Sequence, residues 1–194
     1  MEIAGLSCLL AILIAFPLGV LLSRVRWLTG PVLGTAGIFY TIPSLALFAL
    51  LIPILGLGMK PTVLALVLYS QLTLIRNTAV GISEVDPALV EAARGMGMTG
   101  VQRFWRVEMP LAVPVVLAGV RTATAMAIGL TTIAAYIGAG GLGVLIFQGI
   151  STAHTDQVLA GALVVSAIAL VADLVLALLQ RALGSVTGVR AWAS

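Results

Sequence analysis

Five long apolar stretches limit the folds that are open to this chain. A helix that crosses the bilayer core needs roughly 20 mostly apolar residues, because its backbone polar groups must be hydrogen-bonded within the segment. Stretches of that kind occupy residues 3–22, 31–54, 61–80, 111–137 and 158–180. The sequence therefore predicts an all-α integral membrane protein with five transmembrane helices.

The charge content supports this class. Only 9% of the 194 residues are charged and 61% are hydrophobic, whereas soluble domains carry about 25% charged residues. The ten basic residues are spread along the chain and do not form the clustered basic face that nucleic-acid binding requires. We therefore expect the lipid bilayer, and no nucleic acid, among the partners. With Cys8 as the single cysteine, an internal disulfide is excluded.

The basic residues also predict how the spans are oriented, because cytoplasmic loops carry more Lys and Arg than outer loops. With the N-terminus outside, Lys60 is the one basic residue on the outer side and Arg121 lies within a span. The other eight fall on the cytoplasmic side: Arg24, Arg26, Arg76, Arg94, Arg103, Arg106, Arg181 and Arg190. We expect an outer N-terminus and a cytoplasmic tail over residues 183–194.

The connection over residues 81–110 is the one long polar excursion, and it contains two helical signals. Asp86 followed by Pro87 is typical of a helix N-cap and first turn, and Gly95 and Gly97 supply a stop. The run from Thr99 to Gln102 has the spacing of a capping box. We expect a hairpin of two short helices whose second helix ends at Pro110. By composition alone, such a hairpin also fits a segment that rests on lipid headgroups.

One pattern runs through both helices of this hairpin. Its fixed positions are Glu91, Ala92, Ala93, Gly97, Val107, Met109 and Pro110. The spacing resembles the EAA loop of ABC importer permeases, which reads Glu-Ala-Ala, three residues, Gly, nine residues, aliphatic, any residue, Leu, Pro. Val107 stands for the usual Ile and Met109 for the usual Leu, and both changes keep an apolar side chain.

The resemblance implies a coupling helix that sits in a groove of a separate ATPase subunit. In that arrangement Glu91 offers a carboxylate to the partner, and Ala92 and Ala93 allow close approach. Gly97 permits the reversal between the helices, and Pro110 marks where the next span begins. ATP and Mg²⁺ would bind to the partner, because this chain has no P-loop and its only lysine, Lys60, is followed by proline. No cofactor is expected on this chain.

The similarity covers nearly the whole chain and implies the type I, methionine-importer-like permease fold over residues 1–182. It also implies three kinds of partner: ABC ATPase subunits, an extracytoplasmic substrate-binding protein, and a second permease copy or a sister permease. Such importers lie in the cytoplasmic (inner) membrane of bacteria or archaea. The chain is expected to be a transport subunit and not an enzyme.

Two further stretches, residues 74–78 and 135–143, look like the osmoprotectant permeases, which import glycine betaine, choline, carnitine or proline betaine. Permeases for amino acids and taurine share parts of these stretches, so a permease for such a solute is the alternative. Outside the class, an ATP-independent secondary transporter would often show an inverted repeat. Five spans do not divide into equal halves, and no repeat is visible.

The glycines after the fourth span form G-x-G-x-x-G at Gly138, Gly140 and Gly143. A dinucleotide fingerprint needs a strand before it and a helix after it, whereas this run follows a membrane helix. Together with Gly141, these residues favour a glycine hinge. The hinge would let the chain re-enter the membrane from the outside as a short helix at about 144–150.

Two charged residues, Arg121 and Asp173, lie inside the fourth and fifth spans. Charges at that depth usually face the bundle interior or a water-filled path. They are candidates for lining the pathway or for pairing with each other, and the alternative is that Arg121 reaches the headgroups.

No metal site is expected, because His154 has only Asp156 near it in the sequence.

Overall fold

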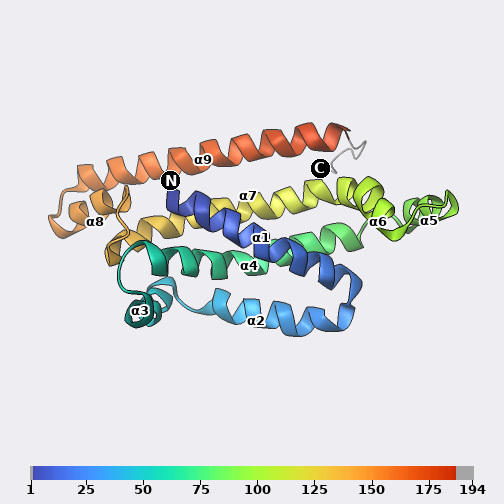
Figure 1. The fold of residues 1–194 in the computed structure, drawn as a ribbon. Helices are drawn as coiled ribbons and strands as arrows, with labels where there is room; N and C mark the ends of the chain where they lie inside the picture. The colour runs from blue at the N-terminus through green and yellow to red at the C-terminus, as the bar shows by residue number, and fades with distance from the viewer. Residues whose placement is uncertain (1, 187–194) are drawn as a thin grey trace.

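The structure is a computed structural model that describes residues 2–186, and over that range it consists of helices and connecting turns (Figure 1). The α-helices are α1 (Glu2–Arg24), α2 (Thr29–Thr41), α3 (Ser44–Leu55), α4 (Met59–Ser83), α5 (Pro87–Gly95), α6 (Gly100–Arg103), α7 (Met109–Ala134), α8 (Gly143–Ser151) and α9 (Thr155–Val186). A π-helical segment, Phe104–Glu108, joins α6 to α7, and short 3₁₀ turns occupy Arg26–Leu28 and Ala135–Ile137. The predicted all-α class is confirmed.

The centre of the bundle is α4, which packs against α1, α2, α3 and α7. One core cluster contains Ala11 and Ala15 of α1, Ile75 and Ala79 of α4, and Ala123 of α7. Helix α9 runs along the outside of α7, and α8 lies against its first turns (Figure 1). The two short helices α5 and α6 project from the opposite end of the bundle from α8.

Small residues on α7, namely Gly119, Ala123 and Ala127, allow the neighbouring helices to pack closely. Both alanines are 1% exposed. A Cβ atom at Gly119 would lie 2.6 Å from the Cβ atom of Asn77 on α4. Helices in a membrane associate largely through such close packing, because lipid provides no hydrophobic drive between them.

The second predicted span is not one straight helix. Helices α2 and α3 meet at 96°, and the break falls at Ile42 and Pro43, whose ψ angles of 128° and 136° are extended. Proline disfavours a helical conformation in the residue before it, and the hydroxyl of Tyr69 on α4 donates to the freed carbonyl of Ile42. Over the described residues, four other helices are long and apolar enough to cross a membrane, and the bent pair makes a fifth crossing if it counts as one span.

The last helix is longer than the sequence predicted. It starts at Thr155 instead of residue 158 and continues to Val186, past the predicted end at residue 180. The first residues of the predicted tail, 183–186, are therefore helical. The remainder of that tail, which includes Arg190, lies outside the described residues.

A glycine loop connects α7 to α8. Gly138, Gly140 and Gly141 have φ angles of +83°, +75° and +83°. Residues with a Cβ atom rarely adopt these positive values. The chain reverses there and continues as α8, close to the predicted short helix at 144–150. Gly143, in the first turn of α8, lies so close to α7 that a Cβ atom would be 2.1 Å from the carbonyl oxygen of Thr132. That these glycines act as a moving hinge stays a prediction.

Candidate functional site

The hairpin of α5 and α6 forms as its local sequence predicts. The Asp86 carboxylate caps α5 by accepting from the backbone N–H of Ala88 at 2.8 Å, and Pro87 occupies the first turn. The helix ends at Gly95, and Gly97, with φ at +77°, reverses the chain. These local signals account for where the first helix of the hairpin begins and ends.

The second half of the hairpin begins with the predicted capping box. The backbone N–H of Gln102 donates to the Thr99 hydroxyl at 3.3 Å, and the N–H of Thr99 donates to the Gln102 side chain at 2.9 Å. The helix does not end at Pro110 as predicted. Its path continues through the π-helical segment into α7, because Pro110 falls in the first turn of α7, where a missing N–H is tolerated. The second half of the hairpin and the fourth span are therefore one continuous helical element, Gly100–Ile137.

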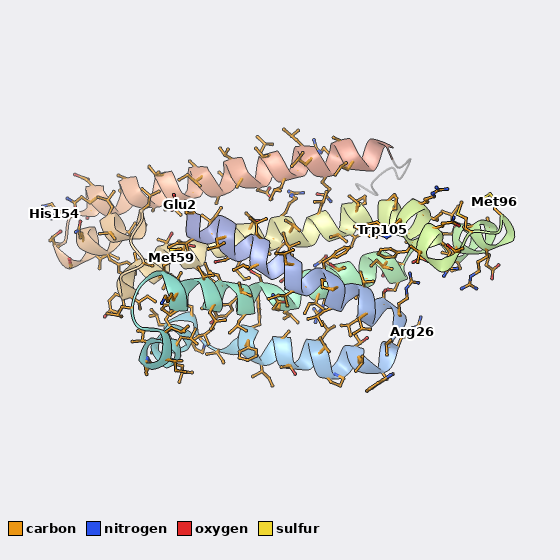
Figure 2. All side chains as sticks on the ribbon, viewed as in Figure 1. Glu2, Arg26, Met59, Met96, Trp105 and His154 are labelled. Carbon is orange, nitrogen blue, oxygen red and sulfur yellow. The ribbon has the colours of Figure 1, made fainter. Side chains whose placement is uncertain are left out.

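The hairpin presents charged and apolar side chains together on its open surface. Glu91 and Ala92 are exposed, whereas Ala93 is 1% exposed and packs inside the hairpin. Val107, Met109 and Pro110 are partly buried at its base. The large exposed apolar side chains of the hairpin are Leu89, Met96, Val101 and Trp105. Figure 2 shows Met96 at the tip and Trp105 nearer the bundle. Such a mixed surface is suited to contact with another protein.

The most buried charged side chain at this end is Glu108, which is 2% exposed. Its carboxylate accepts from the guanidinium of Arg24, at the end of α1, and from Nε of Arg103 at 2.9 Å. The Arg24 guanidinium also lies over the ring of Phe104, 5.9 Å from its centroid. We call Arg24, Arg103 and Glu108 the α1 clamp. It ties the end of the first span to the base of the hairpin.

Sequence reasoning missed this clamp, because Glu108 occupies a position of the loop pattern that is free to vary. The available signal was an acidic residue directly before an apolar span and shortly after Arg103 and Arg106. Burial raises the pKa of Glu108, but hydrogen bonds and charges from Arg24 and Arg103 lower the pKa more, so that it lies below its ordinary value of 4.5. The carboxylate is therefore ionised at neutral pH and the clamp is an ion pair.

A cleft of about 280 Å³ separates the end of α1 from α5. Its charged lining residues are Arg24, Arg26, Glu91, Arg94 and Glu108. Glu91, which was predicted to contact the ATPase, thus lines this charged cleft. Gly97 and Pro110, the other two positions of the loop pattern with a predicted structural role, do not line it. The structure places the clamp and Glu91 around one space between the hairpin and α1.

The two charges predicted inside the spans are bonded to each other. Arg121 donates to both carboxylate oxygens of Asp173 at 2.9 Å, in the bidentate geometry that makes such pairs strong. Arg121 also donates to Gln180 at 2.9 Å, and the Gln180 side chain donates to the carbonyl of Pro114 at 2.7 Å. This network joins α7 to α9, so Arg121 is held by its neighbouring helix and does not extend alone toward headgroups. A role in lining the pathway stays a prediction.

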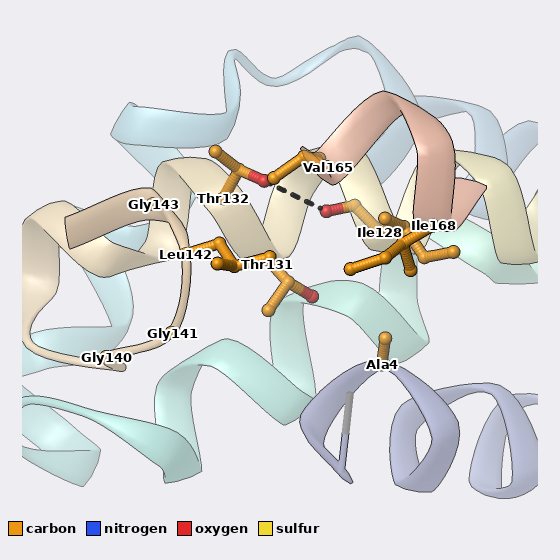
Figure 3. Close-up of a pocket in the computed structure, with 10 residues that line it drawn as sticks. All are labelled: Ala4, Ile128, Thr131, Thr132, Gly140, Gly141, Leu142, Gly143, Val165 and Ile168. Carbon is orange, nitrogen blue, oxygen red and sulfur yellow. Dashed lines mark hydrogen bonds between the residues drawn. The ribbon is translucent and has the colours of Figure 1, made fainter. Parts of the chain in front are cut away.

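At the other end of the bundle, a cavity of about 180 Å³ lies under the glycine loop, between α7 and α9 (Figure 3). Its walls are mostly apolar, and Ala4 of α1 closes one side. The hydroxyls of Thr131 and Thr132 line it, but both donate to carbonyls of their own helix, at 2.7 and 3.3 Å. Among the residues that the structure describes, no group of three His, Cys, Asp or Glu side chains is placed to hold a metal ion.

Residues 9–185 match the model of a known protein family, the binding-protein-dependent transport system inner membrane component. This chain belongs to that family. It is a multi-pass inner-membrane permease of the ABC importer class, a transport subunit and not an enzyme, because ATP hydrolysis in this class belongs to a separate subunit. Such permeases generally work with an ATPase and a substrate-binding protein. The match favours this class over a secondary transporter.

Close relatives have been named for their cargo. The osmoprotectant import permease protein OsmW of Salmonella typhimurium is 48% identical over 183 residues, which cover 92% of this chain and 85% of that protein. The glycine betaine/carnitine/choline transport system permease protein OpuCB of Bacillus subtilis is 43% identical over 179 residues, covering 92% of this chain and 82% of its own length.

The fold also matches solved structures. The MetNI methionine ABC transporter, solved in inward facing conformations, gives a TM-score of 0.84 at 22% sequence identity, over 94% of this chain and 91% of that chain. At this identity the likeness establishes the fold alone. The predicted type I, methionine-importer-like permease fold is confirmed.

Proposed function

We propose that this chain forms part of the membrane pathway of an ATP-driven importer for an osmoprotectant such as glycine betaine, choline or carnitine. The observation that carries the proposal is near full-length identity of 43–48% to relatives named for these solutes. A second permease, either another copy or a sister chain, completes the pathway. Import of an amino acid or taurine is the alternative cargo.

Uptake measurements test the cargo directly. The permease is produced with its own ATPase and binding protein in cells that lack other uptake systems for these solutes. Labelled glycine betaine, choline and carnitine are then supplied singly, with labelled taurine as the comparison. Uptake of at least one quaternary ammonium solute supports the proposal, and uptake of taurine alone contradicts it.

Within this importer the α5–α6 hairpin couples the permease to the ATPase. Three features support that role. The hairpin projects from the bundle (Figure 1), its surface mixes exposed Glu91 with apolar Met96 and Val101, and its second half, from Gly100, continues into α7 without a break. A force on the hairpin therefore acts on the fourth span, and through the α1 clamp it also acts on the first. Movement of rigid elements of this kind is how alternating access is produced.

Charge reversal on the hairpin tests this coupling. Glu91→Lys should leave the permease inserted in the membrane but abolish substrate-stimulated ATP hydrolysis and uptake. Asp156→Lys is the matched control, because it reverses an exposed carboxylate at the start of α9, near the opposite end of the bundle. Normal uptake by Glu91→Lys, or an equal loss in the control, would show that the hairpin is not the coupling surface.

The orientation belongs to the same proposal: an outer N-terminus, with the hairpin in the cytoplasm. It is supported by the positions of the arginines: Arg26 and the hairpin, which carries three further arginines, lie near one end of the bundle (Figure 2). Lys60 follows Met59, which lies near the other end. In a Cys8→Ala background, the His154→Cys variant should react with a membrane-impermeant maleimide in intact cells. The Met96→Cys variant should react only after permeabilisation. The reverse pattern refutes this orientation.

A further inference from the structure

We propose that the crevice between the end of α1, the start of α2 and the flank of α4 binds the headgroup phosphate of an anionic phospholipid. The crevice has a volume of about 280 Å³ and is lined by two arginines, Arg26 and Arg76. It adjoins the cleft beside Glu91, with which it shares Ser23, Arg26 and Ser83, but binding of a lipid there is distinct from ATPase coupling and from solute transport, so it goes beyond the proposed function.

The two arginines have no anionic partner within the part of the chain that the structure describes. Both are exposed, and the ion pairs of that part involve Arg24 and Arg103 with Glu108, and Arg121 with Asp173. An arginine on a membrane-spanning helix is expensive to leave unpaired. A phosphate group can accept two parallel hydrogen bonds from each guanidinium.

The nearby carboxylates do not fill this need. Glu91 and Glu108 line the adjoining cleft, but Glu91 makes no ion pair with Arg26, and both oxygens of Glu108 are occupied by Arg24 and Arg103. Glu84 follows α4 directly and makes no ion pair with either crevice arginine. The crevice is therefore positively charged and open to an external anion.

The position of the crevice corresponds to the headgroup region. Arg76 lies seven residues before Ser83, the end of α4, which places it about 10 Å along the helix from that end at 1.5 Å per residue. Trp27, next to Arg26, is 76% exposed, and tryptophan is enriched where membrane meets water. Figure 2 places Arg26 at the turn between α1 and α2, set back from the hairpin tip at Met96. A subunit docked on the hairpin would thus lie beyond the crevice, whereas lipid lies beside it.

The walls of the crevice fit an amphipathic ligand. Leu22, Leu33 and Val80 provide an apolar surface for the start of an acyl chain. The hydroxyls of Ser23 and Ser83 donate to carbonyls of their own helices, at 2.7 and 3.2 Å. The two arginines and the hydroxyl of Thr29 are therefore the groups that remain to hold the phosphate, as in basic pockets between membrane helices that bind lipid headgroups.

Native mass spectrometry of the purified permease–ATPase complex tests the proposal. The complex is incubated with phosphatidylglycerol or phosphatidylcholine, and the lipids retained are counted. Wild type should retain phosphatidylglycerol in preference. The Arg26→Gln/Arg76→Gln variant should bind it about 25-fold more weakly, from roughly fivefold per basic residue near the membrane surface. The control, Lys60→Gln/Arg181→Gln, removes the same charge from exposed positions outside the crevice and the hairpin, and should bind the lipid as wild type does.

Each other outcome contradicts the proposal. Equal retention of both lipids by wild type, or unchanged retention by the crevice variant, shows that the crevice is not an anionic lipid site. Loss of the ATPase from the crevice variant, with lipid retained, identifies the crevice as a protein contact. If the double variant does not fold, Arg26→Lys/Arg76→Lys keeps the charges and should retain phosphatidylglycerol, and the single glutamine variants should each show the fivefold loss.

Discussion

The α1 clamp gives a prediction whose size can be worked from the structure. Removing one partner from a fully buried ion pair costs about 3–5 kcal/mol, because the other charge stays buried without compensation. The carboxylate of Glu108 is 2% exposed, but the Arg24 side chain is 43% exposed and Arg103 is 15% exposed. Since exposed pairs contribute only about 0–1 kcal/mol, we expect Glu108→Gln to lower the free energy of unfolding by about 2–3 kcal/mol.

Most of that loss comes from Arg103, the more buried of the two arginines. Arg103→Gln should therefore be more destabilising than Arg24→Gln. In Arg24→Gln, Glu108 stays paired with the more buried Arg103, and the side chain that is lost was largely solvated. The assay is thermal unfolding of the detergent-solubilised permease, followed by the amount of protein that remains monodisperse after heating. Uptake in cells should fall in the same order, because the clamp joins α1 to the hairpin that we propose couples the permease to the ATPase.

A double-mutant cycle separates the ion pair from a general effect of charge. Arg24→Gln and Glu108→Gln should show a coupling energy of about 1 kcal/mol, the upper range for a partly exposed pair. Arg26 is the control, because it lines the same cleft without pairing to Glu108. Equal coupling of Arg24 and Arg26 to Glu108, or a Glu108→Gln variant as stable as wild type, would refute the clamp.

Three further predictions follow from the same structure. The pKa of Glu108 in the folded protein lies below its ordinary value of 4.5. The clamp therefore contributes its full stability above pH 4.5 and loses it as the pH falls through the lower folded-state pKa. When the unfolding temperature is measured against pH, its decrease at acid pH should be less steep for Glu108→Gln than for wild type. Gly97 has a φ angle of +77° and open space around it. Gly97→Asn should be tolerated, because Asn adopts a positive φ more readily than most residues. Gly97→Val should abolish stimulated ATP hydrolysis, because a β-branched residue rarely adopts this conformation. Gly119→Ala would force a Cβ atom to 2.6 Å from that of Asn77 and should destabilise the bundle by about 1–3 kcal/mol in the same thermal assay; Gly129→Ala, also on α7 but with open space at the Cβ position, should have no such effect.

The parts of the fold that the sequence predicts well are those with local causes. The bounds of α5 follow from the Asp86 cap, the proline after it and the glycines at its end, all of which act within a few residues. The capping box at Thr99 is likewise formed by residues three positions apart. The spans themselves follow from length and apolar content, which is why α1, α4, α7 and α9 lie close to the predicted ranges.

The parts that could not be predicted depend on contacts between distant residues. Pro17, Pro53 and Pro114 stay within helices, whereas the chain bends sharply at Pro43, where Tyr69 from another helix binds the freed carbonyl. Nothing local to Pro43 distinguishes it from the others. Glu108 and Arg24 are likewise 84 residues apart in the sequence, so only their proximity in the folded bundle shows that they pair.

The bond between Arg121 and Asp173 has a consequence for how the protein is made. The arginine is synthesised 52 residues before its partner, an interval of about 3–10 s at ordinary rates of chain elongation. During that time α7 contains the charged Arg121, while Asp173, whose carboxylate will bind it, has not yet been synthesised. A chain whose synthesis stops before residue 173 therefore carries Arg121 in α7 without the carboxylate that holds it in the complete permease.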